Sequence, residues 1–363
     1  MGRLRYFGLL WVFFLIAVTN TINVYSQLEK SLKLDSIFQE YARENYPGMN
    51  ILVQKEGEVL FSKSYGLADI QKKEEFTQHS KINLGAITRQ FTAAGIMILK
   101  DRDKLTLEQS VGDILDMPDY ASDITINHLL LQVSGLPYSF HDVTDITNEE
   151  LLDFLHEKNQ LSFKPNTRAQ HNPANYALLA LIIEKISGKD YRKFMEDNVF
   201  KPLRMNHTEV FKDGWFSGVK NRATGYIFNS EENDFDISEK ELGNDYLRGV
   251  TGVFSDMNDL KKWLSVWKSD VLLSESSLKI AKRIKFFRNA KFFYGFGWRR
   301  GFNAGHNYLF AGGSDMGYTS FIFMHPSENF ELIILHNQTS IFGLHRNAFE
   351  ILNLYSDKQY EVK

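Results

Sequence analysis

The sequence predicts an α/β fold whose sheet is mixed, mainly antiparallel, and built from strands at both ends of the chain. The runs that read as strands lie at residues 50–54, 59–64, 294–298, 308–310, 318–324 and 331–335. Most of the sequence between these two groups has helical periodicity. Strands at both ends with helices between them indicate one sheet flanked by helices, with a mostly helical subdomain inserted in the middle.

Composition excludes several classes of protein. The chain has 363 residues, 43% of them hydrophobic, which is typical of a globular protein with a large core. A net charge of −3 and the lack of a basic block argue against nucleic acid as a partner. Without cysteine, disulfides, thiolate metal sites and a cysteine nucleophile are excluded. The ten histidines are scattered, with no metal-ligand spacing, so we expect no metal and no cofactor.

Residues 1–26 have the pattern of a signal peptide. Arg3 and Arg5 precede an unbroken apolar run at 6–18, and Val24 and Ser26 suit the −3 and −1 positions of a cleavage site. The alternative is an uncleaved membrane anchor, although the run is shorter than the ~20 residues that a spanning helix needs. We therefore expect an exported protein, periplasmic or extracellular, or else one anchored by this segment. No later run is long enough to span a membrane.

The mature domain is expected at 27–363. Its sheet is predicted from about 28–85 and 290–363, and its helical subdomain from about 86–270. The segments with helical periodicity or helix-ending signals are 28–45, 126–133, 148–156, 176–186, 191–199, 257–267 and 341–354. Residues 213–245 are polar and irregular, which predicts a long surface excursion. The sequence carries no signal for the oligomeric state.

The functional prediction depends mainly on the stretch from Leu84 to Lys100. A strand-like run ends at Gly85, and a helical pattern of apolar residues follows. The first turn of that helix reads Ala86-Ile87-Thr88-Arg89. Ala86 offers no nucleophile. Arg89 keeps its proton at any ordinary pH and cannot act as a base.

From about residue 28 onward, the chain resembles the β-lactamase-related serine hydrolases, which include class C β-lactamases, DD-peptidases and esterases. The segments that carry the resemblance, in chain order, are SYG at 64–66, INLGAITRQFTAAGI at 82–96, HLLLQVSGLP at 128–137, FKPNTRAQHNPANYALLALIIEKISG at 163–188, TGVFSDMNDLKKW at 251–263, YGFGW at 294–298 and FAGGSDMGYTSF at 310–321. Together they cover most of the mature chain and imply the penicillin-binding-protein-like fold.

The resemblance also places three catalytic motifs, and the sequence departs from each. Ser-x-x-Lys, which supplies the nucleophile and a lysine, falls on Ala86 and Arg89. Tyr-x-Asn, which supplies the base and an amide, falls on His171 and Pro173. His-x-Gly or Lys-Thr-Gly falls on Ala311 to Gly313, keeping the glycine and losing the basic side chain. No catalytic residue is therefore expected to be intact.

What remains is a candidate binding pocket. Its expected residues are Arg89, His171, Asn172, Gly312, Gly313, Ser314 and Asp315. Gly312 and Gly313 could face a ligand or merely form a tight strand end. A buried Arg89 needs a partner, and we favour Asp315 over Asn172 or an anionic ligand.

We interpret the sequence as an exported pseudoenzyme that binds a peptide-like or anionic small molecule, or acts as a scaffold, at the cell envelope. Two alternatives remain open. One is an esterase or peptidase that uses non-standard residues, for which Ser314 with His171 is the best pair. The other is a purely structural envelope protein with a filled pocket.

Overall fold

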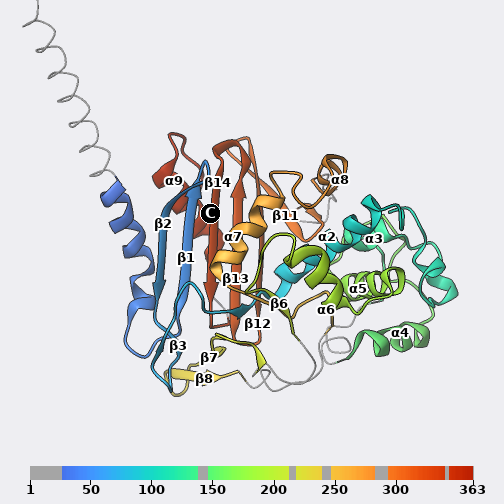
Figure 1. Cartoon of the computed structure of the whole chain (residues 1–363), viewed down its shortest axis with the longest axis horizontal. Coiled ribbons are helices and arrows are strands. Elements are labelled where there is room, and N and C mark those ends of the chain that lie inside the picture. Colours follow the sequence, from blue (N-terminus) through green and yellow to red (C-terminus); the bar gives the residue numbers. More distant parts are fainter. Residues whose placement is uncertain are drawn as a thin grey trace, which may run out of the picture.

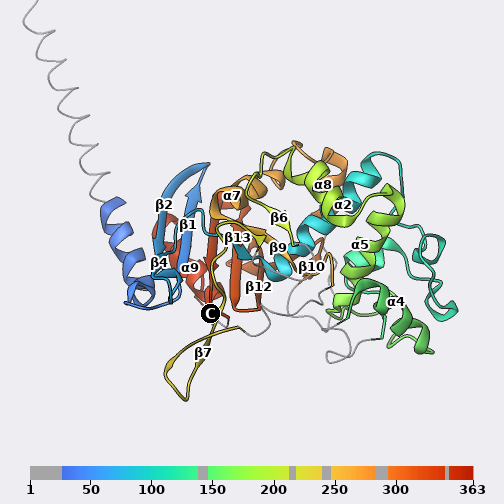
Figure 2. The ribbon, with the colours of Figure 1, turned by 60° about the horizontal axis from the view of Figure 1, so that its bottom comes forward.

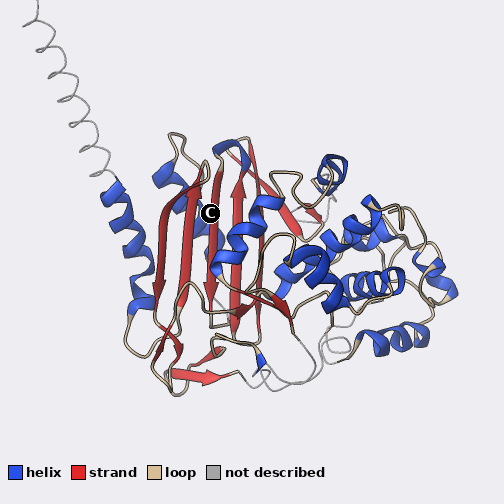
Figure 3. Ribbon diagram, in the orientation of Figure 1, coloured by secondary structure: helices blue, strands red, loops and turns tan. Residues whose placement is uncertain are grey.

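The computed structural model describes residues 27–137, 146–211, 218–238, 247–282, 293–339 and 343–362. A large twisted sheet stands at one side of the molecule, and a lobe of helices stands at the other (Figures 1 and 3). The predicted signal peptide lies outside the described residues. Within them, no helix has both the length and the apolar character that crossing a bilayer would require.

The sheet has seven strands in the order β10-β11-β12-β13-β14-β1-β2. Every neighbouring pair in it is antiparallel. The strands are β1 (Met49–Lys55), β2 (Glu58–Tyr65), β10 (Phe293–Gly295), β11 (Trp298–Asn303), β12 (His306–Asp315), β13 (Tyr318–His325) and β14 (Phe330–His336). The contact of β1 with β14 joins the two ends of the chain, so the expected fold class is the one observed.

Each face of the sheet has its own apolar core. On one face, the N-terminal helix over residues 27–38 and α9 (Leu344–Tyr355) cover a cluster that includes Phe323 and Phe349. On the other face, α7 (Met257–Val266) and α2 (Thr88–Asp101) cover a larger cluster that extends into the helical lobe. β13 and β14 are buried along their whole length, because a sheet covered on both sides needs apolar residues at consecutive positions.

The helical lobe surrounds α2 (Figure 2). Its other helices are α3 (Ile126–Leu130), α4 (Asn148–Glu157), α5 (Pro173–Ser187), α6 (Tyr191–Met195), which continues as a π-helical turn (Glu196–Phe200), and α8 (Glu275–Ala281). Residues 88–99 of α2 are all buried, and they include polar side chains. Because α2 is buried on all sides, its position is fixed by the elements packed around it. Its first turn is therefore held against the sheet.

Within the described residues, three small sheets accompany the large one. The first pairs β3 (Leu67–Asp69) with β4 (Glu74–Glu75). The second has the order β5-β9-β6, with β5 (Ile82–Asn83), β9 (Val253–Ser255) and β6 (Glu209–Val210). The third is a hairpin of β7 (Tyr226–Asn229) and β8 (Asp234–Ile237). That hairpin lies within the stretch expected to be an irregular excursion, so part of it is ordered strand.

The expected strand at 294–298 is two strands instead. β10 and β11 are joined by a turn at Phe296 and Gly297, both with positive φ. A Cβ on Gly297 would lie 2.7 Å from the backbone nitrogen of Gln90 on α2. This turn therefore packs the edge of the large sheet directly against α2. Only glycine fits at position 297, which explains the second glycine of YGFGW.

Candidate functional site

The junction between β5 and α2 is built by backbone packing against β12. Gly85 to Ile87 form a short 3₁₀ turn that leads into α2. A Cβ on Gly313 would lie 2.5 Å from the backbone nitrogen of Ala86 and 2.9 Å from the carbonyl oxygen of Leu84. Only glycine allows β12 to approach so closely. The first and third motif positions are therefore in direct contact, as the resemblance implies, and Ala86 remains partly exposed between them.

Arg89 follows one turn later and is almost fully buried, at 6% exposure. Its Nη1 is hydrogen-bonded to Nε2 of His171, which stands just before α5. Its Nε is buried without a hydrogen-bond partner. Among the described residues, no carboxylate lies within ion-pair distance of Arg89. Burying a guanidinium without a counter-charge costs free energy. An anion bound beside Arg89 would reduce this cost.

His171 is neutral in this setting. Burial, the guanidinium of Arg89 and that of Arg299 together lower the pKa of His171 to about 3. His171 as a whole is exposed to solvent, but both arginines oppose a third positive charge. A neutral imidazole leaves the Nε2 lone pair free to accept the N–H of Arg89.

Arg299 on β11 was not predicted as a site residue. Burial and the nearby charge of Arg89 lower the pKa of Arg299, while Tyr294 raises it. Its guanidinium lies over the ring of Phe310, 6.0 Å from the centroid. The hydroxyl of Tyr294 is buried without a hydrogen-bond partner. Two guanidiniums, a neutral imidazole and a phenol thus converge, and we call Arg89, His171, Tyr294 and Arg299 the cationic cluster. No motif spacing marks Arg299, because it lies just after the YGFGW turn.

Asn172 has a structural role that the sequence analysis missed. Its side chain caps α5 by accepting the N–H of Ala174 (3.0 Å), and it donates to the carbonyl oxygen of Leu136 (3.2 Å). Its backbone N–H donates to Gln132 Oε1 (2.8 Å). With every one of these groups engaged, Asn172 does not serve as the partner of Arg89. The sequence contained the signal, because asparagine followed by proline is typical of a helix start.

Hydroxyl side chains in the segments that resemble the family also have structural partners. Ser134 in the SGLP turn donates to Asn175 Oδ1 (2.6 Å), and Thr88 accepts the N–H of Val253 (3.2 Å). Ser314 is exposed, and its Oγ lies 3.2 Å from Thr319 Oγ1 on β13. His171 is bonded to Arg89 instead, so the contacts give no support to a Ser314–His171 pair.

The predicted third motif lies on β12, next to the start of α2. Ala311 is buried at 4% exposure, on the same face of β12 as Gly313. Gly312 points the other way, where a Cβ would lie 2.9 Å from the carbonyl oxygen of Ser320. Gly312 therefore belongs to a tight strand contact, and Gly313 to the contact with Ala86. The side chain of Asp315 lies outside what the structure describes, so its pairing with Arg89 stays a prediction.

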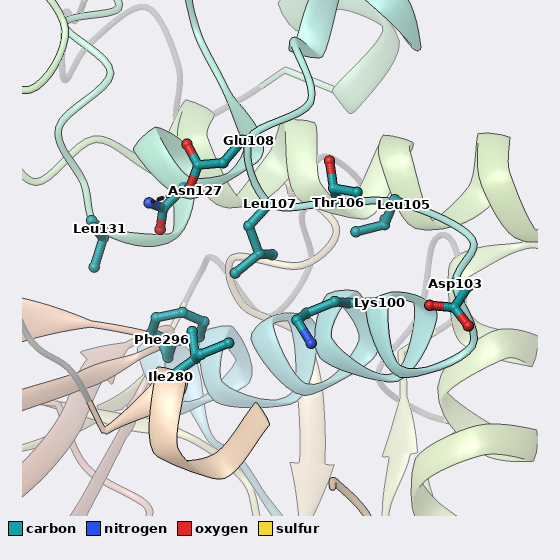
Figure 4. Close-up of a pocket in the computed structure, with 10 residues that line it drawn as sticks. All are labelled: Lys100, Asp103, Leu105, Thr106, Leu107, Glu108, Asn127, Leu131, Ile280 and Phe296. Atoms are coloured by element: carbon teal, nitrogen blue, oxygen red, sulfur yellow. Dashed lines mark hydrogen bonds between the residues drawn. The ribbon is translucent and has the colours of Figure 1, made fainter. Parts of the chain in front are cut away.

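A separate cavity lies beside the second half of α2. A space of about 670 Å³ is bordered by the second half of α2, the loop at 105–108, α3 and α8 (Figure 4). Lys100, Leu107 and Phe296 line it, and none of the motif residues does. Its size alone does not make it the functional site, because it is separate from the residues that carry the motif positions.

Comparison with known proteins identifies the family. The profile described as Beta-lactamase matches residues 34–354, most of the chain. The chain belongs to this family. Relatives include Protein flp from Staphylococcus aureus (strain NCTC 8325 / PS 47), 27% identical over 325 residues, and Penicillin-binding protein 4* from Bacillus subtilis (strain 168), 26% identical over 287 residues. These matches cover 85% and 74% of this chain, respectively, but 63% of each relative's length.

Solved structures agree with the fold. The octameric penicillin-binding protein homologue from Pyrococcus abyssi is 26% identical, with a TM-score of 0.79, over 90% of this chain and 77% of its own. A penicillin binding protein from Bacillus halodurans has a TM-score of 0.75 at 22% identity, over 89% of this chain and 98% of its own, and supports the fold alone. The family and fold expected from the sequence are thereby confirmed.

Proposed function

We propose that this member of the beta-lactamase family is an exported pseudoenzyme that binds a small carboxylate ligand without forming a covalent bond. The single observation that carries the proposal is the buried guanidinium of Arg89, which has no acidic partner among the described residues. Arginine holds a carboxylate through two parallel hydrogen bonds. In this pocket a carboxylate would supply the missing counter-charge.

The rest of the cationic cluster supports the choice of an anion. Arg299 adds a second positive charge, and neutral His171 holds one N–H of Arg89 in place. The buried Tyr294 hydroxyl can donate a further hydrogen bond. One relative is named Penicillin-binding protein 4*, and penicillins carry a carboxylate, which is consistent with this ligand class.

The absence of covalent chemistry follows from the residues at the motif positions. Ala86 has no hydroxyl at the start of α2, and Arg89 cannot accept a proton. His171 has an unprotonated ring, but its Nε2 is already hydrogen-bonded to Arg89. The pattern of residues 1–26 supports export. Together these features favour a binding protein over the competing hydrolase.

The test compares free carboxylates with their amides. N-acetylated dipeptides, offered with a free C-terminus or with a C-terminal amide, are added to the purified protein, and thermal melting and calorimetric binding are measured. We expect the acids, and not the amides, to raise the melting temperature. Arg89→Met and Arg299→Met should each abolish that shift.

Arg102→Met is the matched control, because Arg102 ends the same helix but is exposed and hydrogen-bonded to Asn198 (2.7 Å). It should keep the wild-type response. Equal shifts from acids and amides, or unchanged binding by both cluster variants, would contradict the proposal.

A further inference from the structure

The small sheet β5-β9-β6 gathers three side chains that are far apart in the sequence. His79 precedes β5, His207 precedes β6, and Asp256 directly follows β9. β5 and β6 both run antiparallel to β9. The beginnings of β5 and β6 therefore lie beside the end of β9, and the three residues meet at one edge of this sheet.

Their ligand atoms are close enough to share one ion. One atom from each of His79, His207 and Asp256 lies within 4.8 Å of the other two. Nδ1 of His207 is 2.7 Å from Asp256 Oδ2, and Nδ1 of His79 is 3.7 Å from the same oxygen. Both imidazoles thus face one carboxylate oxygen. Small side-chain rotations would place three donors around a single metal ion.

The charge balance points to a cation. Asp256 is fully buried, at 0% exposure. In the part of the chain that the structure describes, its only ion-pair partners are the two exposed histidines. Neighbouring Asp259 is also buried, but it is paired with Lys262 (2.7 Å). A buried carboxylate whose only ion-pair partners among the described residues are histidines needs positive charge, from protonated histidine or from a metal.

The support around Asp256 is already rigid. Its Oδ1 accepts the N–H of Asp259 (2.9 Å) and so caps α7, which fixes the direction of Oδ2. Ser255 and Thr208, the immediate neighbours of two of the ligands, are joined by a hydrogen bond of 2.8 Å. Hydrogen bonds around the metal ligands hold those ligands in place and raise the affinity for the metal.

We propose that His79, His207 and Asp256 form a zinc site. Two imidazoles and one carboxylate are nitrogen and oxygen donors that suit Zn²⁺, and water completes the tetrahedral coordination at the exposed side. The ion replaces the direct His207–Asp256 hydrogen bond and lies between the two groups. Its role is to tie the segments before β5 and β6 to the start of α7. This departs from the expectation that the scattered histidines bind no metal.

The experiment uses purified protein stripped with a chelator and dialysed into metal-free buffer. Zinc chloride is titrated at neutral pH by calorimetry, and cobalt is substituted to record its visible spectrum. We expect one ion per chain, a higher melting temperature with zinc, and a tetrahedral cobalt spectrum. His79→Ala and His207→Ala should each weaken zinc binding by more than about tenfold.

Two further variants sharpen the result. Asp256→Asn keeps an oxygen that can cap α7 but removes the charge, so it should weaken zinc binding without unfolding the protein. His156→Ala is the matched control, because His156 is an exposed histidine also beside an aspartate, with Nε2 3.7 Å from Asp116. It should bind zinc like the wild type.

The possible outcomes distinguish a zinc site from an ion pair. Should the wild type show no saturable binding, or should both histidine variants bind as it does, the three residues are only a histidine–carboxylate ion pair and the site does not exist. Because His79 and His207 are exposed, each variant should still fold, and its melting in chelator beside that of the wild type separates lost binding from lost folding. The test does not depend on the cationic cluster.

Discussion

Arg89 on the first turn of α2 is hydrogen-bonded to His171 Nε2, which lies 82 positions later in the chain. The sequence resemblance places these two residues at the lysine and tyrosine positions of the family. The contact joins an arginine, which keeps its proton, to an imidazole that holds it. On that placement, we propose that a fixed positive charge stands in place of the family's proton-transfer groups.

The first prediction concerns covalent chemistry. Incubation with a β-lactam or a fluorophosphonate should leave the intact mass unchanged, because Ala86 provides no nucleophile. Ala86→Ser alone should remain inactive, since no group is free to accept its proton. Loss of a nucleophile in a serine protease costs on the order of 10⁶ in rate, so weak background turnover does not bear on the outcome. A stoichiometric adduct on the wild type would refute the pseudoenzyme proposal.

The second prediction separates stability from binding at Arg89. Without ligand, Arg89→Met should stabilise the protein by about 1–4 kcal/mol, because an apolar side chain replaces a buried charge that lacks a counter-ion. Denaturant unfolding measures this gain, with Arg102→Met as the neutral control. A large loss of stability would reveal an acidic partner, and the Asp315 pairing would then become the better explanation.

The third prediction is the acid sensitivity caused by His171. Its pKa falls from 6.5 to about 3 on folding, so between these values the unfolded chain binds a proton that the folded chain does not. Stability should therefore decrease as the pH falls from about 6.5 to about 3, and it should be unaffected by this group above that window. His171→Gln should flatten the curve of melting temperature against pH. An unchanged curve would mean that His171 titrates normally in the folded protein.

His336 should add to the same acid loss. It is fully buried on β14, both its ring nitrogens lack a hydrogen-bond partner, and burial lowers its pKa to about 3. His171→Gln is therefore best compared with His336→Leu and with the double variant. Independent sites should give additive changes in the pH curve, whereas a dominant His336 would leave little change in the His171 variant.

The fourth prediction tests the structural role of Asn172. Asn172→Ala removes the cap of α5 and the hydrogen bond to the Leu136 carbonyl, and should cost about 1–3 kcal/mol of stability. Carboxylate binding by the remaining folded protein should be retained, because the amide does not reach Arg89. Loss of ligand binding with unchanged melting would instead restore Asn172 to the pocket.

The fifth prediction concerns the contact between β12 and α2. Gly313→Ala should destabilise the protein by about 1–3 kcal/mol, because its methyl group would collide with the backbone at Ala86. Gly218→Ala is the control, since nothing lies within 4 Å of a Cβ built there. Equal melting of the two variants would show that the junction is looser than described.

The sequence alone predicted the large elements well, for physical reasons. Periodicity marks α5 and α7, whose apolar faces are long, and it marks β13 and β14, which are continuously apolar. It failed at β11, where Arg299, Arg300 and Gly301 break the apolar pattern near the edge of the sheet. A strand that is half polar, as β11 is, gives only a weak periodic pattern.

Contacts between residues far apart in the chain could not be predicted from the sequence. Periodicity places Arg89 and His171 on their own elements but does not say that they meet. Arg299 enters the cluster only because the turn at Gly297 packs on α2. His79, His207 and Asp256 have no common spacing, and only the antiparallel arrangement of β5, β9 and β6 brings them together.

The pairing of β1 with β14 has a consequence for how the chain folds. β1 pairs with β14 from Met49↔His336 to Lys55↔Phe330, and Gln54 contacts Glu331 across a separation of 277 positions. During synthesis, the hairpin of β1 and β2 is therefore made long before its second neighbour exists. Closing so long a loop makes folding slow, and the apolar strand stays uncovered meanwhile. A chain that must cross a membrane before it folds would benefit from this delay.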